Sequence, residues 1–185
     1  TMIVNNSFEP VNDMMLVAKY YDFDGNETLL NQEIAYMEAS DAKKIVPLQG
    51  VLEERLKTDG GFLYLQLLDR HGKLLSDNFY WYPNADGKHT GLNKMKKAEI
   101  RVTSKALSNG KMEISISNAK GNPVAFFNRI ALVNAKTGER ILPAFYSDNY
   151  ISVPPGEIKT ITVEYDSQPN LSTKIEVLGW NTSYN

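Results

Sequence analysis

The sequence contains no cysteine and only two histidines in 185 residues. A chain without cysteine has no disulfide framework, no thiolate nucleophile and no thiolate-bound metal. Two histidines are too few for the usual zinc ligand sets, and no glycine-rich loop joins a strand to a helix, as nucleotide binding requires. We therefore expect no metal and no cofactor.

The sequence has neither a net positive charge nor a long hydrophobic segment. The 20 basic and 22 acidic side chains leave a formal charge of −2, whereas proteins that bind nucleic acid generally carry a surplus of Lys and Arg. The longest unbroken apolar run, Met14–Ala18, has five residues, and a membrane-spanning helix needs about 20. We expect neither a nucleic-acid partner nor insertion into a membrane.

The two-residue repeat that marks β-strands dominates the hydrophobic pattern. Met112, Ile114 and Ile116 alternate with polar residues along Lys111–Asn118, which predicts a strand with one buried and one wet face. Segments with more continuous apolar sequence predict strands that are buried in a sandwich. These segments are Met14–Tyr21, Phe62–Leu68, Phe79–Tyr82 and Phe126–Val133, and further alternating pairs are Ile100 and Val102, Ile161 and Val163, and Ile175 and Val177.

Turn-forming residues separate these segments. Residues 22–26, 69–73 and 134–139 each place Asp or Asn a few positions ahead of a Gly, which is the composition of a tight hairpin loop. Only Leu48–Leu56 has near-helical spacing, and we expect a turn or two of helix there. Short strands with turns between them predict an all-β chain built from antiparallel sandwiches.

A polar stretch with two glycines, residues 84–95, interrupts the strand pattern and indicates a linker. The segments on either side are each close to the size of an immunoglobulin-like domain, which has about 100 residues. We therefore predict two tandem immunoglobulin-like antiparallel β-sandwiches, over residues 1–83 and 96–185, with a linker over residues 84–95.

The side chains that catalysis requires are present but not suitably placed. His71 lies in a predicted turn and His89 in the predicted linker, so we expect both to be exposed and to lack an orienting carboxylate. Glu53 and Glu54 adjoin basic residues and indicate a solvated face. Asp69, at a strand end, is the one acid beside an apolar segment that would raise its pKa. We predict no catalytic residue in this chain.

Two aromatic clusters, Phe79–Tyr82 and Phe145–Tyr150, are the candidates for binding sugar, because an aromatic ring stacks on the apolar side of a pyranose. Alternate residues of a strand point in opposite directions, so two of the four rings in the first cluster should belong to a core. Packing within the protein is the alternative for both clusters. The candidate carbohydrate contacts are Trp81, Tyr82, Tyr146 and Tyr150.

Three motifs in the second half are distinctive: Asn128–Tyr150, Pro155–Glu157 and Gly179–Asn181. They resemble the last domain of a glycoside hydrolase family 2 subgroup that contains exo-β-D-glucosaminidases, β-mannosidases and endo-β-mannosidases. In the first half, Tyr21–Gly25 and Leu74–Trp81 are similar to the immunoglobulin-like domain that follows the catalytic barrel in such enzymes.

The resemblance implies that the chain holds only the last two domains of such an enzyme. The family places its acid/base glutamate in an Asn-Glu pair at the end of a barrel strand. The single Asn-Glu pair here, Asn26-Glu27, lies in a predicted hairpin turn, so the role does not transfer. Because the family has a short strand before the equivalent of Met2–Asn5, we expect the first sandwich to be truncated at its N-terminus.

The expected function is that of non-catalytic accessory domains of a family 2 β-glycosidase, which support a catalytic barrel in cis during hydrolysis of β-glycosides. A glycan is a second expected partner. Such enzymes are often periplasmic or extracellular, which is the location that the resemblance favours. The alternatives are a free-standing carbohydrate-binding module and a cell-surface β-sandwich module, because a fold does not dictate a function.

Overall fold

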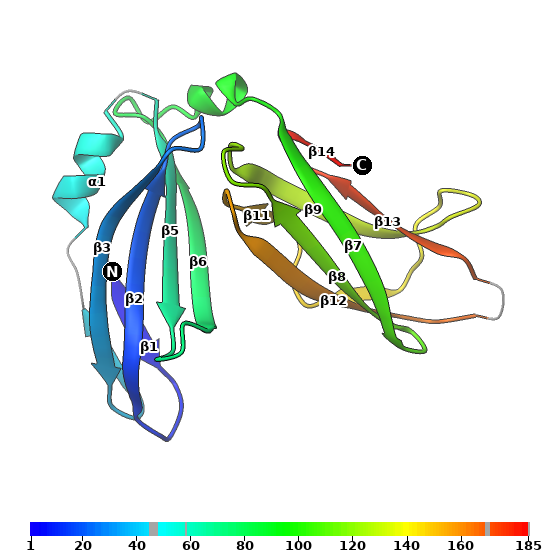
Figure 1. The fold of residues 1–185 in the computed structure, drawn as a ribbon, viewed down its shortest axis with the longest axis horizontal. Helices are drawn as coiled ribbons and strands as arrows, with labels where there is room; N and C mark the ends of the chain where they lie inside the picture. Colours follow the sequence, from blue (N-terminus) through cyan, green and yellow to red (C-terminus); the bar gives the residue numbers. More distant parts are fainter. Residues whose placement is uncertain (45–47, 58, 169–170, 185) are drawn as a thin grey trace. The chain divides into compact units, whose positions relative to one another are not determined.

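A computed structural model describes residues 1–44, 48–57, 59–168 and 171–184. The chain forms two compact units, which we call unit 1 (Thr1–Lys94) and unit 2 (Met95–Asn185). Strands dominate both units (Figure 1), and the all-β prediction is confirmed. Residues 84–94 are grouped with unit 1, where residues 84–88 form a tight turn and Thr90–Lys94 form the 3₁₀ helix η1.

Unit 1 contains a four-stranded antiparallel sheet in the order β3-β2-β5-β6 and a two-stranded sheet of β1 and β4. Its helix α1 (Gln49–Arg55) confirms the short helix predicted within residues 48–56. The strands are β1 (Met2–Asn5), β2 (Val11–Tyr21), β3 (Glu27–Met37), β4 (Asp41–Lys44), β5 (Gly61–Leu68) and β6 (Leu74–Tyr82).

Buried side chains lie on both faces of the four-stranded sheet. On one face Leu16 of β2 clusters with Ile3 of β1, and Tyr20 of β2 clusters with Leu52 of α1. The helix and the small sheet therefore cover the same face. Phe62 of β5, on the opposite face, is fully buried. Each such apolar side chain contributes about 1.5–3 kcal/mol when it is removed from water.

Strand β6 corrects one prediction. The apolar segment Phe79–Tyr82 was expected to be buried, but Tyr80 and Trp81 are 43% and 46% exposed. Among the described strands β6 pairs only with β5, so it lies at a sheet edge, and hydrophobicity alone does not say which strand will be an edge. Phe79 is half-buried, and its ring centroid lies 5.3 Å from that of Phe62.

Unit 2 packs a five-stranded sheet, β10-β12-β8-β7-β14, against a three-stranded sheet, β11-β9-β13. Among the strand pairs that the structure describes, all are antiparallel except β7 with β14. The strands are β7 (Ala98–Ser108), β8 (Lys111–Asn118), β9 (Ala125–Asn134), β10 (Ala144–Tyr146), β11 (Ile151–Val153), β12 (Ile158–Tyr165), β13 (Thr173–Leu178) and β14 (Thr182–Tyr184).

The core of unit 2 follows the predicted alternation. Ile114 and Ile116 of β8 are fully buried between the sheets, facing Ile130 and Leu132 of β9 across the core cluster. The polar residues between them leave the outer face of β8 partly wet. The strand predicted over Lys111–Asn118 is confirmed residue for residue.

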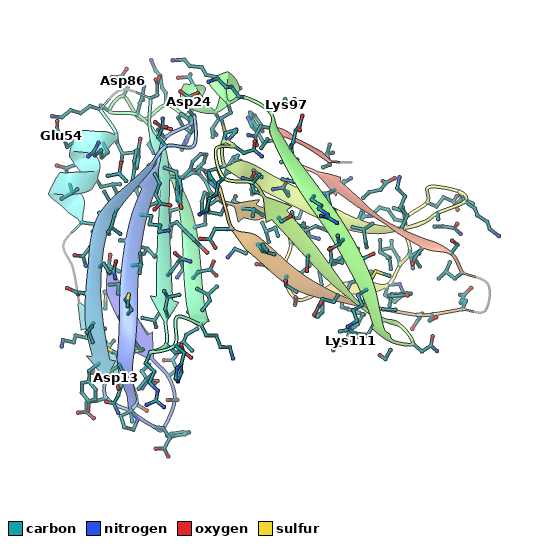
Figure 2. All side chains as sticks on the ribbon, in the orientation of Figure 1. Asp13, Asp24, Glu54, Asp86, Lys97 and Lys111 are labelled. Atoms are coloured by element: carbon teal, nitrogen blue, oxygen red, sulfur yellow. The ribbon has the colours of Figure 1, made fainter. Side chains whose placement is uncertain are left out.

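Asx side chains close the predicted turns. The Asp22 carboxylate accepts hydrogen bonds from the backbone N–H groups of Asp24 (3.0 Å) and Asn26 (2.9 Å). Asn134 accepts one from the N–H of Lys136 at 2.8 Å. Gly25, the fourth residue of the loop over residues 22–26, has a φ of 92°, which glycine adopts without steric cost. The turn predictions are confirmed, and Figure 2 shows Asp24 at the loop after β2.

Candidate functional site

Trp81 and Tyr82 lie on opposite faces of β6, so they do not form one binding surface. Tyr82 is half-buried and lines a hollow of about 780 Å³ in unit 1, together with Tyr80, Leu52 and Leu63. Burial, and secondarily the neighbouring Tyr80, raise the pKa of the Tyr82 hydroxyl. Trp81 and Tyr82 are neighbours in the sequence, but consecutive side chains of a strand point to opposite faces of the sheet.

The hydroxyl of Tyr146 is used in a hydrogen bond within the protein. Its side chain is half-buried against the core of unit 2, and its hydroxyl oxygen accepts a hydrogen bond from the backbone N–H of Leu132 at 2.7 Å. This bond joins β10 of the five-stranded sheet to β9 of the three-stranded sheet. The geometry favours packing, the alternative stated for this residue, over a sugar contact.

Tyr150 has the features of a surface platform. Its side chain is 52% exposed, and its ring centroid lies 5.3 Å from that of Phe127, with the two planes inclined by 42°. Tyr150 and Phe127 have φ angles of 56° and 53°. For bulky residues this left-handed region is strained, at a cost of about 1–3 kcal/mol for each residue. Sequence reasoning missed Phe127 because it lies inside an apolar run.

Two asparagines hold the backbone beside this pair. Asn128 is fully buried, and its Nδ2 donates to the carbonyls of Ala125 (2.8 Å) and Ile151 (3.0 Å). Asn149 pairs with the backbone of Ile130 in both directions, since its Oδ1 accepts from the N–H at 2.8 Å and its Nδ2 donates to the carbonyl at 3.0 Å. These bonds fix the loop before β11 against β9.

The prediction that the pKa of Asp69 is raised is wrong. Asp69 does not have a raised pKa: hydrogen bonds from the backbone N–H groups of Lys73 and His71 lower the pKa of its carboxyl. Glu54 lies on α1 (Figure 2), and its hydrogen bond from Lys57 lowers the pKa of its carboxyl. A general acid for glycoside hydrolysis needs the opposite shift.

The remaining candidates behave as surface groups. His71 and His89 are exposed, as predicted, and so are the side chains of Glu53 and Glu54. Within residues 1–44, 48–57, 59–168 and 171–184, no three His, Asp or Glu side chains are grouped so that they could hold a metal ion. Among the same residues no helix is long and apolar enough to cross a membrane.

Comparisons with known proteins place the chain in a family. The family model of the exo-β-D-glucosaminidase Ig-fold domain matches residues 78–182, which is more than half of the chain. An exo-β-D-glucosaminidase of Arthroderma benhamiae is 31% identical over 158 residues, which cover 76% of this chain and 17% of that protein.

Two solved structures show the same fold. The exo-chitosanase CsxA of Amycolatopsis orientalis matches 98% of this chain with 24% of its own, at a TM-score of 0.79 and 22% identity. The β-D-mannosidase of Dictyoglomus thermophilum matches all of this chain with 20% of its own, at a TM-score of 0.68 and 16% identity. The chain thus spans about a fifth of the length of these proteins. The resemblance found in the sequence is confirmed, and the chain belongs to the exo-β-D-glucosaminidase Ig-fold domain family.

Proposed function

We propose that this chain forms two accessory sandwich units of a larger β-glycosidase and works in cis with a catalytic domain that acts on β-D-glucosaminides. The observation that carries the proposal is the family match over residues 78–182, combined with relatives in which this part is about a fifth of the protein. β-Mannosides are the runner-up substrate class, because a β-D-mannosidase shares the fold at lower identity.

The Asn-Glu pair supports an accessory role through the bonds that its glutamate makes. The carboxylate of Glu27 accepts a hydrogen bond from the Tyr21 hydroxyl at 2.6 Å and pairs with the Lys19 ammonium at 3.2 Å. Both partners belong to β2, so the carboxylate of Glu27 is engaged in holding two strands of one sheet together. Glu27 therefore anchors the start of β3 to β2.

The rigid framework of unit 2 supports a mechanical role. The buried amide of Asn181 donates to the carbonyls of Lys96 and Val124, each at 2.9 Å, and accepts from the N–H of Phe126 at 2.9 Å. Fully satisfied buried networks of this kind fix one backbone arrangement. A firmly built sandwich suits a part that buttresses a neighbouring catalytic domain.

The test is a hydrolysis assay on the isolated chain with nitrophenyl β-D-glucosaminide and nitrophenyl β-D-mannoside. We expect no turnover above the buffer blank, while an intact exo-β-D-glucosaminidase serves as the positive control. Turnover by the isolated chain that disappears in the Glu27→Gln variant would overturn the proposal. A second arm deletes the matching segment from the intact relative, and unchanged activity and solubility after deletion would count equally against a supporting role.

A further inference from the structure

Phe127 and Tyr150 both occupy a costly backbone conformation although neither is Gly or Asn. The pairing of β11 with β9 contains a bulge, since Ile151 faces Asn128 while Val153 faces Ala125. The bulge inserts one extra residue into β9, and Phe127 has the left-handed φ of 53° within it. Bulges of this kind re-aim a side chain, often beside a functional site.

The surroundings determine this conformation through several independent bonds. The N–H of Phe127 donates to the Ser152 hydroxyl at 3.2 Å, and the Thr182 hydroxyl donates to the Oδ1 of Asn128 at 2.9 Å. A side-chain β-carbon at Gly179 would lie 2.3 Å from the same Oδ1, so only glycine fits beside it. Strain that is held this firmly points to a role for the two rings it displays.

The exposed surface of this pair is aromatic, and an acidic residue lies close to it in the sequence. Phe127 is 41% exposed and Tyr150 is 52% exposed, and the planes of their rings are inclined by 42°. Phe126 is buried, and its ring centroid lies 5.7 Å from that of Phe127. Asp148, two residues before Tyr150, is exposed, and its Oδ1 accepts a hydrogen bond from the N–H of Asn149 at 2.7 Å. Aromatic faces attract cations, and a nearby carboxylate adds to the attraction.

We propose that the Phe127–Tyr150 pair is a carbohydrate-binding cradle whose ligand is a β-linked glucosamine oligosaccharide. The apolar C–H face of one pyranose stacks on the rings, and the ammonium group of the amino sugar interacts with a ring face and with Asp148. The inference rests on the proposed function for the class of sugar, and on this structure for the site.

The experiment titrates the intact 185-residue chain with a short chitosan oligosaccharide by isothermal calorimetry and by NMR. Two variants, Phe127→Asn and Tyr150→Asn, remove a ring and keep a residue that tolerates the left-handed backbone. We expect either change to weaken binding by about tenfold or more, which corresponds to the loss of one good contact. Tyr150→Phe keeps the ring and should retain the affinity within about twofold.

Controls separate a binding role from a packing role. Phe145→Asn removes a ring of unit 2 that is 70% exposed and outside the cradle, so it should not change the affinity. Asp148→Asn should weaken binding of the amino sugar and leave binding of its N-acetylated counterpart unchanged, because the counterpart carries no charge. Wild-type thermal stability in the ring variants shows that they fold.

The proposal is overturned if the folded wild-type chain binds neither oligosaccharide at millimolar concentration, or if Tyr150→Asn binds as well as wild type. A weaker affinity in Phe145→Asn equal to that in Tyr150→Asn would also overturn it. Because these readouts measure binding by this chain alone, their failure is distinct from failure of the accessory role, which is measured as hydrolysis.

Discussion

Replacement of Asn128 by Asp tests whether the buried amide of this residue holds β11 against β9 within the three-stranded sheet of unit 2. The substitution changes one NH₂ group to an oxygen and preserves the size of the side chain. In the native protein that NH₂ donates to the carbonyls of Ala125 and Ile151 at 2.8 and 3.0 Å. A carboxylate at the same position would place oxygen against oxygen at both distances.

The expected cost follows from these contacts. The variant loses two hydrogen bonds to buried backbone carbonyl groups, and each buried polar group that loses a partner costs about 1–3 kcal/mol. Burial also raises the pKa of the introduced carboxyl, because the side chain at residue 128 is fully buried. We expect the free energy of unfolding to fall by about 3–5 kcal/mol near neutral pH, the range typical of a buried charge that is left without a partner.

The pH dependence of the loss has a definite sign. A carboxyl whose folded pKa is raised is protonated in both states below its unfolded pKa, which is about 3.9. There it can donate one hydrogen bond, and the destabilisation is smallest. As the pH rises above that value, the unfolded state ionises while the folded state resists ionisation, so the destabilisation grows until the folded pKa is passed.

Urea unfolding followed by tryptophan fluorescence measures this cost. The chain has two tryptophans, Trp81 in unit 1 and Trp180 in unit 2, so a Trp81→Phe background leaves one reporter in the unit of interest. Asn134→Asp is the matched control, because the Oδ1 of Asn134 accepts from backbone N–H groups and a carboxylate does the same. A variant at residue 128 as stable as this control at pH 7 would refute the reasoning.

Two further predictions concern unit 1. A β-carbon at Gly91 would lie 2.2 Å from the Phe23 ring, so Gly91→Ala should lower the free energy of unfolding by about 2 kcal/mol in urea. The control is Gly50→Ala in α1, where an added β-carbon would meet nothing within 4 Å. This change should raise the free energy of unfolding by about 0.5 kcal/mol. Since hydrogen bonds from Lys73 and His71 lower the pKa of Asp69, its stabilising contribution should be complete above the unfolded-state pKa and lost as pH falls through the folded value. A carboxyl NMR titration should place the Asp69 midpoint below that of an unfolded peptide, and an equal midpoint would contradict the assignment.

The alternation of apolar and polar residues predicted β8 well, but no strand was predicted over β3, which is exposed along much of its length. Apolar and polar residues alternate from Lys111 to Ser117, and β8 covers Lys111–Asn118. The same rule does not identify an edge, because the position of β6 depends on which strand pairs with β5. It also gives no sign of β14, whose Thr182–Tyr184 is short and pairs in parallel with β7, a segment distant in the sequence. Neighbours in space, not periodicity, decide these features.

Of the two aromatic residues in the candidate site, the sequence analysis identified Tyr150 but missed Phe127. Tyr150 was identified because it closes a cluster of aromatic residues, whereas Phe127 follows Phe126 in a run that reads as a buried strand. The inserted residue at the bulge breaks the alternation, and Phe126 is buried while Phe127 is exposed. Two of the hydrogen bonds beside the bulge join residues that lie 19 and 23 positions apart in the sequence, Asn149 with Ile130 and Asn128 with Ile151. An asparagine within an apolar strand is therefore the sequence feature to examine, since a buried amide needs partners and so marks a place where the backbone departs from the regular ladder.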